Sequence, residues 1–229
     1  MNRTEGAEHP LLGMPRRDGT VTLLLVLATA ASFILVAYRA TAAPIQRVDD
    51  AVLRWMIGIR SGPLTAVAKV LNALGLVYVT LPVRILIAAF LALRRRWWHF
   101  AAFVSAIVIS EISIGTLKTL YDRARPPGSL VHTSGSSFPS GHAIAASVTV
   151  VAAVIALLPE GRLRYRWGAA AVAFSMLMAL SRAYLAAHWF SDAVAGVLLG
   201  TSIALAAAVV VHEIRRRVRP AGEPDDHVV

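Results

Sequence analysis

Six apolar segments recur along the chain, and each is close to the roughly 20 residues that a helix needs to cross the hydrocarbon of a bilayer. They cover residues 21–38, 76–93, 97–120, 141–158, 167–184 and 190–211, with a short additional helix expected over residues 64–74. Backbone groups in lipid must find hydrogen-bond partners within their own segment, so such segments are helical. The pattern therefore predicts an all-α, polytopic membrane protein with six transmembrane helices in a bundle.

The composition agrees with a membrane class, because 57% of the 229 residues are hydrophobic and only 16% are charged. Cysteine is absent, which excludes disulfides, thiolate metal sites and a cysteine nucleophile. The abundance of Ala, Val, Leu and Arg is typical of a bacterial protein from a GC-rich genome. The first apolar segment is longer than the core of a signal peptide, so we expect it to remain as a membrane anchor.

Basic residues mark one side of the predicted bundle. Thirteen of the 23 Lys and Arg residues fall in four clusters: Arg3, Arg16 and Arg17; Arg94, Arg95 and Arg96; Arg162, Arg164 and Arg166; and Arg215, Arg216, Arg217 and Arg219. With six spans all four clusters lie on one side, which the positive-inside rule assigns to the cytoplasm. The net charge of +10 thus reflects topology and contact with lipid headgroups, and nucleic acid is not expected as a partner.

The domain organisation follows from these segments. We expect a cytoplasmic polar N-terminus over residues 1–18, a six-span domain over residues 19–214, and a cytoplasmic basic and polar tail over residues 215–229. Both termini then lie on the cytoplasmic side of the bacterial cell membrane.

An outer amphipathic helix is expected over residues 45–59, at the membrane interface. Its apolar residues recur at spacings of three and four: Ile45, Val48, Val52, Met56 and Ile59. A packing role for this helix is slightly favoured over a role as a substrate gate.

Three polar clusters, residues 118–126, 139–142 and 181–192, lie at the outer ends of the predicted spans. Lys118, Arg125 and Arg182 bring three cations to one membrane face, where charged groups are functional by default. These cations would repel one another unless an anion lay between them, and arginine holds phosphate oxygens in a two-point fork. Lys118 and Arg125 are seven residues apart, so they share a face if the helix continues.

The remaining polar residues supply chemistry for a bound phosphate. Ser140 is a good N-cap, and Gly141 lets a ligand approach the free N–H groups of a helix N-terminus. His188 and Asp192 are four residues apart, within hydrogen-bond reach if this stretch is helical. A carboxylate on one ring nitrogen prepares the other as a nucleophile, which leaves His142 to act as a general acid.

These clusters resemble the signature of the type 2 phosphatidic acid phosphatase family, the membrane lipid phosphate phosphatases related to vanadium haloperoxidases. That signature reads K-x6-RP, PSGH and SR-x5-H-x3-D, and all eleven specified positions match here in order and spacing. The resemblance implies phosphate binding by Lys118, Arg125, Arg182, Ser140 and the backbone at Gly141. It also implies in-line attack by His188, orientation of that ring by Asp192, and protonation of the leaving oxygen by His142.

The resemblance implies a lipid phosphate or diphosphate substrate, hydrolysed through a phosphohistidine at the extracytoplasmic face of the cell membrane. No metal or other cofactor is implied, because the fixed cations stabilise the transferring phosphoryl group. For a bacterial enzyme the family indicates a polyprenyl diphosphate, phosphatidylglycerophosphate or phosphatidate. We take undecaprenyl or decaprenyl diphosphate as the first choice, on location alone.

Two other functions stay open from the sequence. The phosphohistidine can pass its group to a lipid or sugar alcohol, which would make the protein a phosphotransferase. A non-catalytic lipid-phosphate binding or transport protein would keep the anion site but has no need of a nucleophile. A vanadate-dependent peroxidase shares the site plan, but those enzymes are soluble, and six spans argue against one.

Other polar residues near these segments have open roles. Arg123 is interpreted as a snorkelling anchor, with assistance to the phosphate as the alternative. Arg84 lies inside a span and needs a partner, for which Glu111 is the candidate, although Glu111 is also placed to tune Lys118. His132 lies in the loop of the site and is interpreted as solvated.

Overall fold

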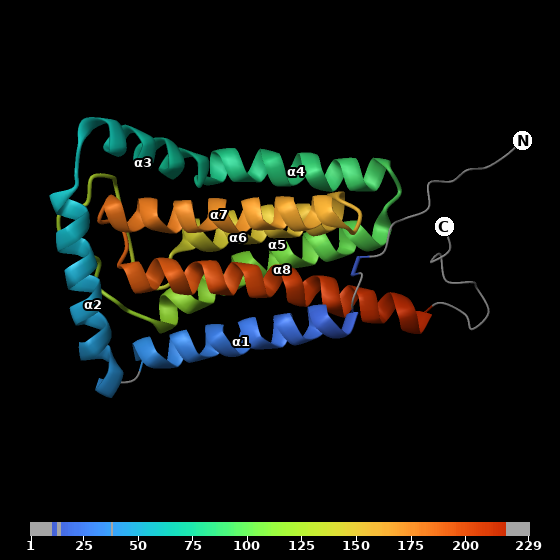
Figure 1. Cartoon of the computed structure of the whole chain (residues 1–229), viewed down its shortest axis with the longest axis horizontal. Helices are drawn as coiled ribbons and strands as arrows, with labels where there is room; N and C mark the ends of the chain where they lie inside the picture. Colours follow the sequence, from blue (N-terminus) through green and yellow to red (C-terminus); the bar gives the residue numbers. More distant parts are fainter. Residues whose placement is uncertain (1–10, 13–14, 38, 219–229) are drawn as a thin grey trace, which may run out of the picture.

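The computed structural model describes residues 11–12, 15–37 and 39–218, which form eight α-helices and no strands (Figure 1). The helices are α1 (Pro15–Ala37), α2 (Arg39–Gly58), α3 (Gly62–Leu74), α4 (Val77–Leu93), α5 (Trp97–Leu120), α6 (Gly141–Leu157), α7 (Arg162–Tyr184) and α8 (Phe190–Val218). The all-α class is confirmed. So is the break in the second apolar region, where a short helix ends at Leu74 and a longer one follows.

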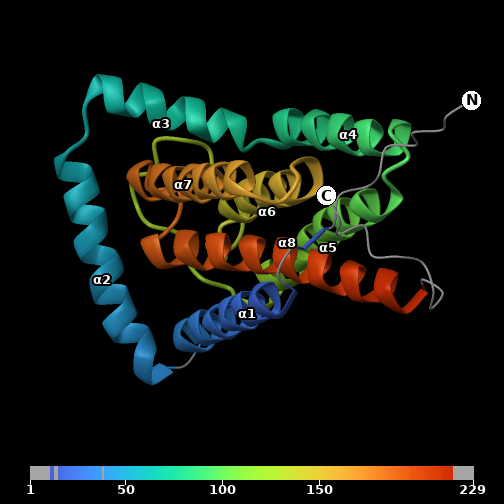
Figure 2. The same ribbon diagram turned by 45° about the vertical axis from the view of Figure 1, so that its right-hand side comes forward.

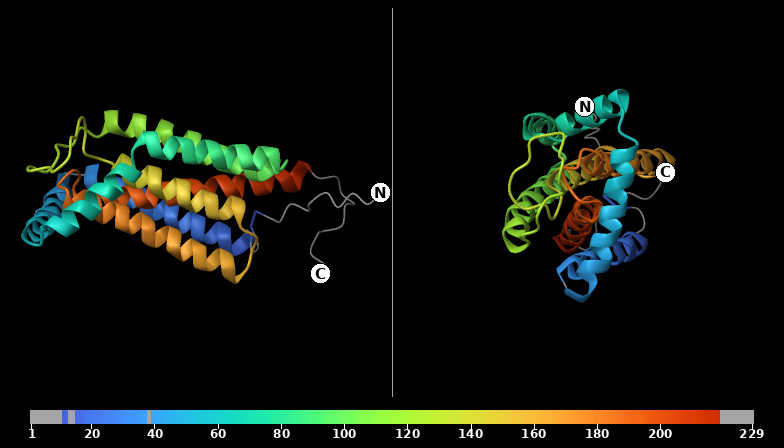
Figure 3. Two further views of the ribbon diagram at one scale, coloured as in Figure 1. Left: turned by 90° about the horizontal axis from the view of Figure 1, so that it is seen from above. Right: turned by 90° about the vertical axis from the view of Figure 1, so that its left-hand side faces the viewer.

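Helices α1, α4, α5, α6, α7 and α8 run side by side between the two ends of the bundle (Figure 1). Helix α6 packs against α5, α7 and α8. Helix α1 lies beside α8 on one flank, and α3 and α4 lie on the opposite flank beside α7 and α6 (Figure 2). Helix α2 crosses one end of the bundle, where it covers the start of α8 (Figure 3). The predicted outer amphipathic helix therefore exists, and it forms a cap over that end.

Length and composition identify fewer candidate membrane spans than the six that the sequence pattern predicts. Of the described helices, three are long and apolar enough to cross a membrane, within α1, α5 and α8, and the α3–α4 pair, bent by 51°, is a fourth if it counts as one span. Helix α6 has 17 residues and falls among the shorter apolar helices. Helix α7 carries arginines near both ends, which lower its mean hydropathy. By length and composition three to four of the described helices are candidate spans, and the six spans expected from the sequence stay a prediction.

The centre of the bundle is a close contact between α6 and α8. Most of α6 is buried, and its small residues let α8 approach its backbone. A Cβ atom at Gly200 would lie 2.7 Å from the carbonyl oxygen of Ile144, and one at Gly196 would lie 2.8 Å from that of Ser140. Only glycine fits at these two positions. Since Ser140 begins α6 beside the start of α8, this contact brings two of the polar clusters together.

A buried arginine ties three helices together. The Nη1 atom of Arg84 in α4 lies 2.6 Å from Oε1 of Glu111 in α5. Its Nε donates to Thr149 of α6 at 2.9 Å. Of the two roles considered for Glu111, pairing with Arg84 is the one that the structure contains.

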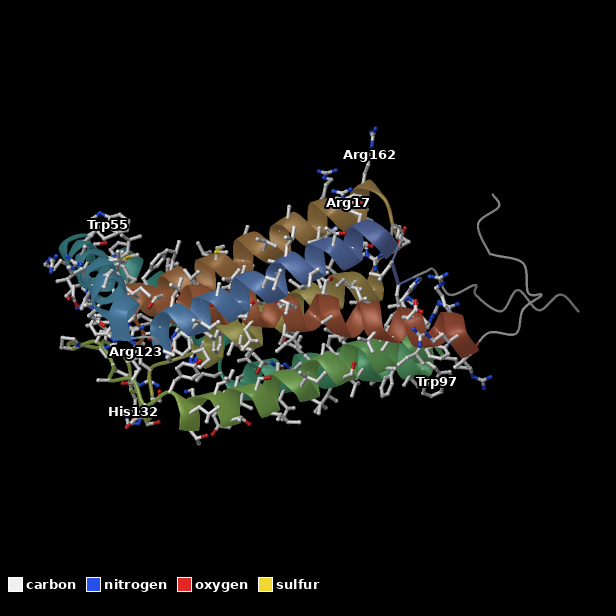
Figure 4. All side chains as sticks on the ribbon, turned by 90° about the horizontal axis from the view of Figure 1, so that it is seen from below. Arg17, Trp55, Trp97, Arg123, His132 and Arg162 are labelled. Atoms are coloured by element: carbon white, nitrogen blue, oxygen red, sulfur yellow. The ribbon has the colours of Figure 1, made fainter. Side chains whose placement is uncertain are left out.

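The helix ends differ from the expected domain boundaries. Helix α1 begins at Pro15, and α8 continues to Val218 rather than ending before residue 215. Leu11 and Leu12 are buried in the core of the bundle, although they belong to the expected polar N-terminus. Residues 1–10 and 219–229 of the two expected tails lie outside the described residues. Arg17 and Arg162 lie at the end of the bundle opposite Arg123 and His132 (Figure 4).

Candidate active site

The three polar clusters meet at the end of the bundle that α2 covers. They cover the last turn of α5 with the loop after it, the N-terminus of α6, and the end of α7 with the turn into the start of α8. The backbone N–H of Ser140 donates to the carbonyl of Asp192 at 3.1 Å, which joins two of them directly. Lys118 interacts electrostatically with Arg125 and Arg182. The charged side chains that the sequence singled out are therefore gathered in one place.

His188 is buried, with 3% of its surface exposed, and both ring nitrogens have protein neighbours. Its Nδ1 lies 2.6 Å from the carbonyl oxygen of Ser137. A carbonyl oxygen only accepts, so the proton belongs on Nδ1, and in the neutral ring the lone pair is then on Nε2. Nε2 faces Nη1 of Arg125 at 3.3 Å. The tautomer that this neighbourhood selects is the one that leaves Nε2 nucleophilic.

The pKa of His188 is set mainly by its burial. The pKa is lowered to about 4: burial lowers it most, Asp192 opposes this by raising it, and the charges of Arg182 and Arg125 also lower it. Neutral imidazole is thus the dominant form at pH 7, which is the form that can attack phosphorus.

Asp192 does not make the expected hydrogen bond to His188. Its Oδ2 lies 3.8 Å from Nδ1, beyond hydrogen-bonding distance. The reason is that residues 185–189 form a turn rather than a helix, with Ala186 at a φ of 52°, and α8 begins only at Phe190. Asp192 instead accepts hydrogen bonds from the Ser137 hydroxyl and, at 2.9 Å, from the backbone N–H of Trp189. The Asp192 carboxylate therefore lies near the ring and holds the backbone on either side of His188 through Ser137 and Trp189.

Arg125 lies in a loop and not on a continuation of α5, which ends at Leu120. Pro126 follows it, and a residue before proline is disfavoured in helical conformation. Loop carbonyls bind the guanidinium: Nε donates to Gly135 at 2.9 Å and Nη2 to Ser134 at 2.7 Å. Nη1 donates to the carbonyl of Ala187 at 2.6 Å, beside the reactive imidazole. The loop therefore fixes this cation next to His188.

The N-terminus of α6 presents polar atoms that have no hydrogen-bond partner in the described part of the chain. Ser140 occupies the N-cap position, but its hydroxyl makes no capping bond. Three buried atoms are in this condition around the site: Oγ of Ser140, Nε2 of His142 and Nε of Arg182. Buried polar groups are nearly always hydrogen-bonded, so such a group of three requires an explanation. A phosphate accepts hydrogen bonds from donors of all three kinds.

The family of the chain is decided by sequence comparison. Residues 96–216, more than half of the chain, match the PAP2 superfamily. The chain belongs to the PAP2 superfamily. It is therefore a membrane lipid phosphate phosphatase, of a metal-independent hydrolase family, as the resemblance in the sequence implied. The matched region contains all three polar clusters.

Relatives of this PAP2 phosphatase were found by sequence and by fold. The chain is 30% identical over 164 residues to phosphatidylglycerophosphatase B of Bacillus subtilis, covering 68% of this chain and 79% of the relative. A crystal structure of a transmembrane PAP2-type phosphatidylglycerolphosphate phosphatase from Bacillus subtilis superimposes with a TM-score of 0.67 at 24% identity, covering 90% of this chain and 98% of that one. Aquifex aeolicus LpxE gives a TM-score of 0.57 at 22% identity, covering 69% and 92%. These structures confirm the transmembrane PAP2 fold.

Sequence reasoning missed the contribution of the α3–α4 break to this PAP2 site. Oδ1 of Asn72 accepts a hydrogen bond from Nη1 of Arg182. Gly75 lies against the ring of His142, and a Cβ there would approach Cδ2 of His142 to 2.5 Å. Neither residue belongs to a motif, and only a glycine just after a predicted helix gave any local signal. The end of α3 and the break after it therefore support Arg182, which is expected to bind phosphate, and His142, which is expected in catalysis.

Arg123 also differs from both roles considered for it. Its Nη1 pairs with Asp192 at 2.5 Å, and its Nη2 pairs with Asp49 of α2 at 2.7 Å. Both ends of the guanidinium are thus bound to protein carboxylates, which accounts for its orientation without a lipid headgroup or a phosphate. His132 is exposed in the same loop (Figure 4), as expected.

Proposed function

We propose that this PAP2 phosphatase hydrolyses its lipid phosphate through a phosphohistidine on His188. Nε2 attacks phosphorus in line, while His142 protonates the oxygen of the departing lipid alcohol or phosphate. Water then attacks the phosphohistidine, and the P–N bond breaks to release inorganic phosphate and free imidazole. The charge on the equatorial oxygens of the transferring phosphoryl group is stabilised by Arg125, Arg182, Lys118, Ser140 and the N–H of Gly141. Asp192 holds the imidazole in its reactive orientation.

One observation carries this proposal. Nδ1 of His188 is bound to the Ser137 carbonyl, and Nε2 faces Arg125, so the nucleophile and a phosphate-binding cation adjoin each other. The unpartnered atoms of Ser140, His142 and Arg182 supply further groups that an anion would satisfy.

We further infer six membrane spans, with the site at the extracytoplasmic face and both termini in the cytoplasm. The support is that α1, α4, α5, α6, α7 and α8 run side by side between two ends (Figure 1). Arginine clusters gather at the end opposite the site, which the positive-inside rule assigns to the cytoplasm. The shorter α6 crosses within the bundle, where neighbouring helices screen it from lipid. Helix α7 exposes apolar side chains such as Val172, Met176 and Leu177, which suit contact with lipid.

The first substrate to test is phosphatidylglycerophosphate, since that is the substrate named for the relative at 30% identity. An undecaprenyl or decaprenyl diphosphate, and phosphatidate, complete the panel. These lipids share a terminal phosphate on a long apolar tail, which is the chemistry that a site at the end of a membrane bundle fits.

The experiment measures phosphate release by purified protein across this panel, with a competing alcohol in parallel reactions to detect phosphotransfer. His188→Ala is expected to lower turnover by at least about 10³-fold, as loss of a nucleophile does elsewhere. It should also remove the labelled protein that wild type forms with ³²P-lipid, quenched in alkali to preserve the acid-labile P–N bond. His132→Ala, an exposed histidine of the neighbouring loop, is the matched control. Labelled His188→Ala protein would refute the nucleophile assignment.

A further inference from the structure

Helix α2 inserts one carboxylate into the end of the bundle. Asp49 is 1% exposed, although it lies on a helix that covers the outside of the molecule. Its Oδ1 accepts the backbone N–H of Ser191 at 2.8 Å, and its Oδ2 accepts the Ser191 hydroxyl at 2.6 Å. Asp49 thus holds the first turn of α8, where negative charge is favoured by the free N–H groups.

The same carboxylate is joined to Asp192 by an arginine. Arg123 donates from Nη2 to Asp49 at 2.7 Å and from Nη1 to Asp192 at 2.5 Å. Nη1 also donates to the Ser191 hydroxyl at 2.7 Å, and Nη2 to Oε1 of Gln46 at 2.9 Å. The guanidinium lies over the ring of Trp189, 5.6 Å from its centroid. Four acceptors and one ring therefore fix the plane of this side chain.

These contacts continue to the reactive imidazole. The second oxygen of Asp192 accepts from the Ser137 hydroxyl, and the carbonyl of Ser137 accepts from Nδ1 of His188. Asp192 has no direct hydrogen bond to the ring, so its place 3.8 Å from Nδ1 depends on what holds the carboxylate. A planar guanidinium between two buried carboxylates sets that place more strictly than a flexible ammonium would.

We propose that Asp49 and Arg123 are positioning residues for catalysis: together they fix the Asp192 carboxylate beside His188, so that the outer helix α2 is part of the catalytic machinery. The inference rests on the proposed role of His188. It gives α2 a purpose beyond packing, because the cap over the bundle end supplies one of the two carboxylates that orient Arg123.

The test compares Asp49→Asn with Asp122→Asn, a matched loss of one carboxylate at an exposed position next to Arg123. A misplacement of the catalytic group by about 1 Å costs on the order of 100-fold in rate. We therefore expect Asp49→Asn to lower kcat by about 10- to 100-fold with KM within about twofold, and to slow the burst of labelled protein equally. Asp122→Asn should match wild type. A residue that only stabilises the fold would lower the thermal midpoint and leave kcat per folded molecule unchanged.

Arg123→Lys provides an independent reading if Asp49→Asn does not fold. Lysine keeps the positive charge between the two carboxylates but cannot reproduce the fork. A fall in kcat of at least about 10-fold with unchanged KM supports the proposal. Wild-type kcat and burst rate in a folded Asp49→Asn or Arg123→Lys protein overturn it. Failure of the proposed function looks different, because wild type would then release no phosphate from any lipid of the panel and form no labelled protein.

Discussion

The Nδ1 atom of His188 lies 2.6 Å from the backbone carbonyl oxygen of Ser137. This contact decides the chemistry available at the site, because a carbonyl acceptor keeps the proton on Nδ1 and the lone pair on Nε2. Mutation of Ser137 cannot remove its backbone carbonyl, so the contribution of this hydrogen bond can be tested only by changing the groups around it. The predictions below concern those groups and the helices that carry them.

The acid limb of the pH profile is expected far below that of an ordinary histidine. Since burial lowers the pKa of His188 to about 4, kcat/KM should stay level as the pH falls through 6.5 and decline only near pH 4. The free enzyme is active with neutral His188, so protonation below the pKa removes activity. Ionisation of the substrate phosphate adds a second limb to the pH profile, and that limb shifts when the substrate is changed. A substrate-independent limb near pH 6.5 would contradict the prediction.

Gly75→Ala is expected to disturb His142. The backbone permits alanine there, with a φ of −85°, but the added Cβ would lie 2.5 Å from Cδ2 of the imidazole. The ring must move, and we expect kcat to fall by roughly 10- to 100-fold. Gly115→Ala is the control, because a Cβ at that helical position meets nothing within 4 Å. Steady-state rates of the two variants at equal folded concentration decide the matter; equal rates would mean that the Gly75 contact is irrelevant.

Glu111→Gln is expected to destabilise the bundle more than an ordinary loss of charge. Arg84 is 7% exposed and pairs with Glu111 at 2.6 Å, so the substitution leaves a buried cation without its carboxylate. Removing one partner of a fully buried pair costs about 3 kcal/mol or more, and exposed pairs contribute less than about 1 kcal/mol. Glu111 is 54% exposed, so the loss should lie between these values. Glu213→Gln breaks an exposed pair with Arg217 and serves as the control. Thermal unfolding in detergent should give a clearly larger midpoint shift for Glu111→Gln; matching shifts would refute the idea.

Chelation of divalent metals is expected to leave turnover intact. The cations that we propose to bind phosphate are side chains, Lys118, Arg125 and Arg182, which EDTA cannot remove. Phosphate release with and without EDTA, followed by addition of magnesium, measures this. Activity lost in EDTA and restored by magnesium would reveal a metal requirement.

The outer helix shows where sequence patterns stop being informative. The apolar spacing over residues 45–59 predicted the helix, but it placed Val48 on the packed side and Asp49 on the polar side. In the structure Val48 is 57% exposed and Asp49 is 1% exposed. The pattern was wrong about Asp49 because Arg123, 74 positions away in sequence, compensates the buried carboxylate.

The sequence alone determined the all-α class and the family, and it predicted the residues of the site, since helix periodicity and motif spacing depend on neighbours within a few turns. Only the tertiary structure decided how these residues are held. The contacts that hold them join segments that lie far apart in sequence. They are the Ser137 carbonyl at His188, Asn72 at Arg182, Gly75 at His142, and the chain Asp49–Arg123–Asp192. Such contacts depend on the packing of α2 against α7 and α8 and of α3 against α7, which no local spacing records.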